Sequence, residues 1–85
     1  MLESLKKQFE IENKKAVELE NLAEEELQKQ EIAKLYEEAQ KPGSILDRTQ
    51  IYVDYTVVKY QIYKKALKQW KKVARIHKQI EELRA

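Results

Sequence analysis

The single histidine and the acidic residues are the first candidates for chemistry. His77 is the only histidine among 85 residues, and Glu81 follows it four positions later. On a helix this spacing puts two potential metal ligands on one face. A di-metal carboxylate bundle also needs inward-facing glutamates and repeated Glu-x-x-His motifs, which this sequence lacks. We therefore interpret His77 and Glu81 as a surface pair and predict neither a metal site nor a cofactor.

Nucleophilic catalysis has little to work with in this chain. The sequence contains no cysteine, one glycine and two serines, Ser4 and Ser44. One glycine cannot build a glycine-rich phosphate loop, and packed helices of this length offer no substrate-sized pocket. We predict a protein that is not an enzyme, with no catalytic residue and no small-molecule substrate.

A cluster of basic side chains is the strongest functional signal. No acidic residue occurs between Asp54 and Glu81, and a helix would place the basic residues of this stretch on one broad face. Such a face can follow nucleic-acid phosphates, with Tyr60, Tyr63 and Trp70 stacking on bases. The sequence favours the alternative that Glu-rich segments and water neutralise the face. An interfacial membrane helix fits less well, because packing needs these aromatic side chains. The candidate anion or nucleic-acid face consists of Lys64, Lys65, Lys68, Lys71, Lys72, Arg75 and Lys78.

The two halves of the chain carry opposite charge. Residues 1–41 contain eleven Glu and seven Lys, whereas residues 42–85 contain ten Lys or Arg and four acids. The halves can therefore attract each other. Antiparallel packing would place position i near position 86 − i, which leaves Lys14 and Lys15 opposite Lys71 and Lys72. This mismatch indicates either a shifted register or a bound anion.

Turn residues cluster only at positions 41–44, Lys-Pro-Gly-Ser. Pro42 cannot continue a helix, Gly43 tolerates a positive φ, and Ser44 can cap the next helix, with Asp47 in the acidic position of a capping box. We predict an all-α antiparallel helical hairpin forming one domain over residues 1–85, with helices at about 2–40 and 45–83. The alternative is a three-helix bundle, produced by a bend near residues 28–31, where the apolar stripe of the first helix changes face.

The start of the second helix poses a conflict between propensity and periodicity. Eleven of the fifteen residues from Thr49 to Tyr63 are Thr, Ile, Val or Tyr, which favour strands. Polar residues nevertheless recur at helical spacing through this stretch, and a lone strand would have no partner. We therefore predict a helix.

The predicted second helix has two apolar edges. Ile51, Tyr55 and Val58 begin one edge, while Val53 and Tyr60 begin the other, and the first helix can cover only one. Exposed large side chains favour a partner, because burial of each is worth about 1.5–3 kcal/mol. A second copy would give a dimeric four-helix bundle, and a different helical protein would serve equally. The residues expected at the interface are Tyr52, Tyr55, Tyr60, Tyr63, Leu67, Trp70 and Ala74.

The sequence thus predicts a non-enzymatic module for self-assembly or protein binding. Nucleic-acid binding through the lysine face is the first alternative, and an engineered bundle without natural function is the second. We expect a cytoplasmic location, because no apolar stretch approaches the roughly 20 residues of a membrane span and residues 1–10 lack the apolar run of a signal peptide.

Overall fold

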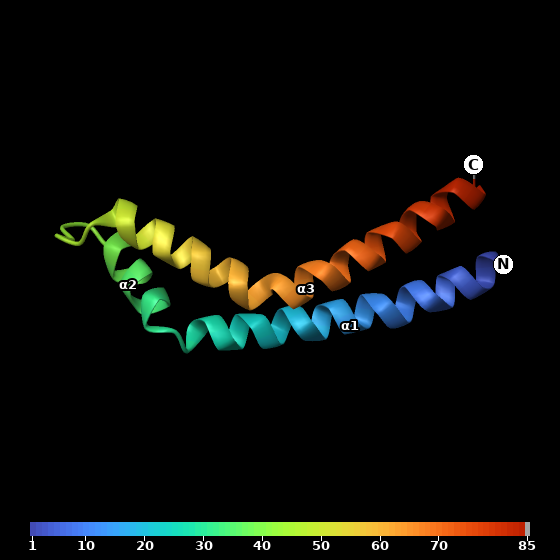
Figure 1. Cartoon of the computed structure of the whole chain (residues 1–85), viewed down its shortest axis with the longest axis horizontal. Coiled ribbons are helices and arrows are strands. Elements are labelled where there is room, and N and C mark those ends of the chain that lie inside the picture. Colours follow the sequence, from blue (N-terminus) through green and yellow to red (C-terminus); the bar gives the residue numbers. More distant parts are fainter. Residues whose placement is uncertain (85) are drawn as a thin grey trace. The chain divides into compact units, whose positions relative to one another are not determined.

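The computed structural model describes residues 1–84 and contains three helices in that range. Helix α1 spans Leu2–Gln28, α2 spans Glu31–Gln40, and α3 spans Arg48–Arg84 (Figure 1). The prediction of an all-α fold is confirmed. The β-prone residues 49–63 are helical throughout, so periodicity outweighs strand propensity here.

The first predicted helix is interrupted, which corrects the prediction of one continuous helix over residues 2–40. Lys29 and Gln30 lie between α1 and α2, and Gln30 has an extended backbone with φ −77° and ψ 138°. The amides of these two residues bond three positions back, to the carbonyls of Glu26 and Leu27 at 3.2 and 3.0 Å. The break falls within the interval 28–31 named for the alternative, and the helix count agrees with that alternative.

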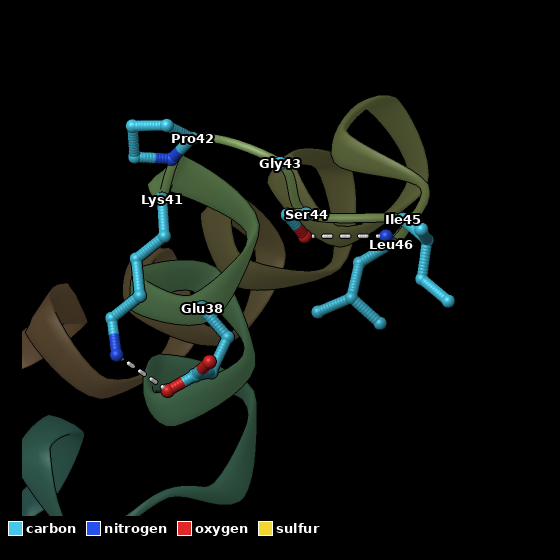
Figure 2. Close-up of a pocket in the computed structure, with 7 residues that line it drawn as sticks. All are labelled: Glu38, Lys41, Pro42, Gly43, Ser44, Ile45 and Leu46. Carbon is cyan, nitrogen blue, oxygen red and sulfur yellow. Dashed lines mark hydrogen bonds and ion pairs between the residues drawn. The ribbon is translucent and has the colours of Figure 1, made fainter.

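The turn confirms the role of Gly43 and corrects that of Ser44. Gly43 has φ 81°, and the Ser44 amide donates to the Lys41 carbonyl at 3.2 Å, which together with Pro42 describes a type II turn. The Ser44 hydroxyl accepts from the Leu46 amide inside the loop (Figure 2). Asp47 caps α3 instead, because its Oδ1 accepts from the Gln50 amide at 3.1 Å. Helix α3 therefore begins at Arg48 rather than at residue 45.

The chain divides into two compact units, each containing part of α1 and part of α3. The first unit joins residues 1–21 to the chain from Lys64 onward. Its two helical segments run antiparallel and side by side, the blue and red ribbons of Figure 1, and the rings of Phe9 and His77 lie 6.0 Å apart. Its buried apolar side chains are Ala16, Ala66, Val73, Ile76 and Ile80.

The second unit comprises residues 22–63, which are the end of α1, all of α2 and the start of α3. Its buried apolar side chains are Ala23, Leu27 and Ala39. The rings of Tyr36 on α2 and Tyr55 on α3 stack with centroids 4.2 Å apart and an interplanar angle of 10°. This aromatic pair joins α2 to α3.

Candidate functional site

A buried carboxylate links α1 and α3 in the first unit. Glu12 is only 6% exposed. Gln69 Nε2 donates to Glu12 Oε2 at 2.8 Å and to the Glu12 backbone oxygen at 2.9 Å. Glu12 Oε1 also pairs with Lys72 Nζ at 3.2 Å and with Lys15 Nζ at 3.4 Å. Glu12 thus lies between two of the lysines whose like charges the sequence left unresolved. No outside anion is needed to hold Lys15 near Lys72.

The electrostatic state of Glu12 follows from these contacts. The hydrogen bond from Gln69 is the main reason why the pKa of Glu12 lies below its ordinary value. Burial alone would raise this pKa. The hydrogen bond from Lys72 and the charges of Lys72 and Lys15 act in the opposite direction and, like the bond from Gln69, lower it. Glu12 therefore stays ionised and acts as a fixed anchor between the helices. It has none of the raised pKa expected of a catalytic acid.

His77 forms the surface pair that the sequence predicts. Its Nε2 lies 3.7 Å from Glu81 Oε1, and both side chains are more than half exposed. Arg84 approaches the same carboxylate at 3.8 Å. Within residues 1–84, no group of three or more His, Cys, Asp or Glu residues is placed to hold a metal ion.

The seven predicted interface residues fall into two groups. Tyr55, Tyr63 and Trp70 are half-buried. The ring of Tyr55 stacks on that of Tyr36. These three contribute to packing within the chain. The exposed members are Tyr52, Tyr60, Leu67 and Ala74.

An apolar patch on the early part of α3 includes two residues that the predicted interface omitted. Val53, Val57 and Tyr60, here called the outer patch, are 48%, 51% and 58% exposed. They occur at positions i, i+4 and i+7, so they share one face of α3. The interval of four between Val53 and Val57 places both on one helical face and could have revealed the patch.

The outer patch faces away from the residues that pack inside the second unit. Ile51, Tyr55, Val58 and Ile62 of α3 are half-buried, whereas all three outer-patch residues are exposed. This agrees with the expectation that the rest of the chain covers only one apolar edge of this helix.

Five of the predicted basic residues form a straight line on α3 in the first unit. Lys72 is engaged by Glu12, and Lys65 lies to one side of the line. The remaining five, here called the basic row, recur at intervals of four, three, four and three, and all are exposed: Lys64, Lys68, Lys71, Arg75 and Lys78. Among residues 1–84, no ion pair involves any of the five.

A hollow lies beside the loop before α3, and it is lined by residues of that loop and by Glu38 (Figure 2). Lys41 Nζ donates to Glu38 Oε1 at 2.9 Å, and this hydrogen bond, helped by the charge of Glu38, raises the pKa of Lys41. Ile45 is fully exposed beside it. This hollow contains one ion pair and no second polar group aimed at a ligand, so we assign it no chemistry.

Within residues 1–84, the helices are too polar or too short to cross a lipid bilayer. Comparisons with protein-family models, with curated proteins and with solved structures find no match for the chain. The functional argument therefore rests on the outer patch and the basic row.

Proposed function

We propose that the protein is a self-assembly module in which two copies associate through the outer patch of α3. The supporting observation is the exposure of about half of Val53, Val57 and Tyr60 on one helical face. An exposed apolar cluster of this kind is typical of an interaction surface. The patch contains no charged residue, so its burial in a dimer would leave no unpaired charge away from water.

The outer patch is complementary to itself, which favours a second copy as the partner. Val53 lies one turn before Val57, and Tyr60 lies one turn after it. When a second α3 crosses antiparallel with the two-fold axis midway between Val53 and Tyr60, beside Val57, Tyr60 of each copy lies against Val53 of the other. A large side chain then meets a small one at both ends, as a two-fold interface requires.

The second unit has a small hydrophobic core, which is a further reason to expect a partner. Its buried apolar residues are two alanines and Leu27. In the proposed dimer, α3 of each copy would lie at the centre with α2 outside it, held there by the Tyr36–Tyr55 stack. The α2 and α3 helices of two copies would then form a four-helix arrangement, as expected from the sequence.

The strength of this association can be bounded. Full burial of one such side chain is worth about 1.5–3 kcal/mol, so completing a half-finished burial contributes about 1 kcal/mol. Six side chains from two copies supply about 6 kcal/mol before the costs of association. Taken as an upper limit on the binding energy, this corresponds to a Kd no tighter than about 40 μM.

Analytical ultracentrifugation from about 10 μM to about 1 mM protein tests the proposal, because this interval extends from below the limiting Kd to well above it. The wild-type chain should shift from monomer to dimer. Tyr60→Glu and Val57→Glu should each remain monomeric, because the dimer would bury an unpaired carboxylate.

The matched control is Gln8→Glu, which adds the same charge at an exposed position of α1 in the first unit, outside the outer patch. This variant should dimerise like the wild type, and circular dichroism should show equal helix content in all four proteins. A wild-type chain that stays monomeric at every concentration contradicts the proposal. Equal loss of dimer in the Gln8 variant contradicts the assignment to the outer patch.

A further inference from the structure

The basic row is a regular array of cations, and none of them has an ion-pair partner among the described residues of its unit. Its five residues extend over fifteen positions of α3, from Lys64 to Lys78, a rise of about 21 Å at 1.5 Å per residue. The row lies on the opposite side of α3 from the buried residues Val73 and Ile76. Lys72, outside the row, shows the contrast, because its charge is balanced by Glu12 at 3.2 Å. The next acid along the row is Glu82, beyond its last lysine.

A shallow hollow occurs at the centre of the row. It is lined by Lys68, Lys71, Ala74 and Arg75. The side chain of Ala74 is a single methyl group, which leaves space between the longer cationic side chains around it. Three cations around an open hollow suit an anionic group such as a phosphate.

The chemistry of the row distinguishes among possible polyanions. A membrane-surface helix must insert an apolar face, but the apolar side of this stretch packs within the first unit through Val73, Ile76 and Ile80. Lysine is depleted at protein–protein interfaces, and four of the five residues are lysines. Lysine and arginine contacts to phosphate dominate non-specific binding of nucleic acids.

The aromatic side chains favour a duplex over a single strand. Single-strand binders stack bases on exposed aromatic rings. Tyr63 and Trp70 are half-buried, and the third stacking candidate, Tyr60, is exposed but lies outside the row, in the second unit. Double-stranded DNA needs no stacking and presents one negative charge per about 1.7 Å of axis, which is about twelve charges along the row.

We infer that the basic row binds the phosphate backbone of double-stranded nucleic acid without sequence specificity. This site shares no residue with the outer patch, so it can exist whether or not the chain dimerises. Each cation that neutralises a phosphate releases a counterion, and affinity must therefore fall with salt. Five contacts predict a slope of log K against log salt of about −4.5.

Fluorescence anisotropy with a labelled DNA duplex of about 20 base pairs measures this slope, with an RNA duplex of equal length as a second probe. Between about 50 mM and about 200 mM salt, the wild-type affinity should fall about 500-fold. The triple variant Lys68→Gln, Lys71→Gln, Arg75→Gln should reduce the slope by about three and bind more weakly at the lower salt concentration. Binding of both duplexes supports recognition of the shared phosphate backbone, and binding of DNA alone or RNA alone assigns the row to that nucleic acid.

The matched control removes three exposed lysines elsewhere, Lys7→Gln, Lys14→Gln and Lys34→Gln, with the same change in net charge. It should keep the wild-type slope, and both triple variants should keep wild-type helix content. No duplex binding at low salt overturns the inference, as does an equal loss in the control. Binding to anionic lipid vesicles without binding to duplex would assign the row to a membrane surface instead and would also overturn it. Sedimentation of the first triple variant without nucleic acid reports separately on the dimer.

Discussion

Glu12 and Glu26 show how much the environment decides at the scale of single residues. Both fall on the apolar face of the first helix by spacing, so the sequence treats them alike. Glu12 is buried and accepts hydrogen bonds from Gln69 across the unit, whereas Glu26 is exposed and accepts one from Gln30 on its own side of the chain. A carboxylate can be buried at the first position because Gln69 and Lys72 satisfy it there.

The lowered pKa of Glu12 predicts a specific dependence of stability on pH. Folding favours the ionised form, so the stabilisation is complete above the unfolded pKa of about 4.3 and is lost as the pH falls through the lower folded value. Urea unfolding at about pH 7 and about pH 3 should therefore show a smaller loss of stability in Glu12→Gln than in the wild type. Glu10→Gln, an exposed neighbour on α1, should keep the wild-type loss. Equal losses in all three proteins would show that Glu12 is not the linked group.

Helix boundaries at the scale of elements depend on short-range geometry that residue types only partly reveal. Ser44 and Asp47 are both good N-cap residues, and the sequence assigned the cap to Ser44. The turn centred on Pro42 and Gly43 leaves Ser44 bonded within the loop to Leu46. Asp47 is then the first suitable acceptor for the free amides of α3.

Substitution of the two candidate caps separates their roles. Asp47→Ala removes an N-cap hydrogen bond and should lower the free energy of unfolding by about 0.5–2 kcal/mol. Ser44→Ala removes an exposed loop contact and should change it by less than about 0.5 kcal/mol. Chemical denaturation followed by circular dichroism measures both values. A larger loss for Ser44→Ala would contradict the assignment of Asp47 as the cap.

At the scale of the whole molecule, the division into two units separates two kinds of surface. The first unit contains twelve Lys or Arg and seven Glu, a balance of +5, whereas the second contains five Lys or Arg and eight acids, a balance of −3. The basic row belongs to the first unit and the outer patch to the second. One small chain can therefore combine an apolar association surface with a separate surface for anions.

The proposed dimer has a defined orientation, which the absence of native cysteine makes easy to test. Antiparallel crossing midway between Val53 and Tyr60 brings position 53 of one copy to position 60 of the other. An equal mixture of Val53→Cys and Tyr60→Cys chains should oxidise mainly to the mixed disulfide dimer, separable by mass. Val53→Cys with Lys59→Cys is the control and should cross-link less, because exposed Lys59 lies about 100° from Tyr60 around the helix. Mainly 53–53 and 60–60 dimers in the first mixture would indicate parallel pairing and contradict this orientation.

The sequence by itself determined the local features of this protein. Helical spacing of polar residues identified α3 despite its strand-forming residues, and Pro42 and Gly43 located the turn. The shifted apolar stripe indicated the break near Gln30 only as the alternative to one continuous helix. The basic row is also readable from spacing alone. These features depend on residues within a few turns of one another, so the linear order contains the information.

Only the tertiary structure decided which side chains remain available. Tyr55 and Tyr60 have the same side chain on the same helix, but Tyr36 on α2 stacks on Tyr55, whereas Tyr60 stays exposed. Lys72 and Lys71 are adjacent, but Glu12 pairs with Lys72. The physical reason is that coverage and charge pairing depend on groups far away in the sequence, and the break between α1 and α2 changes which groups those are.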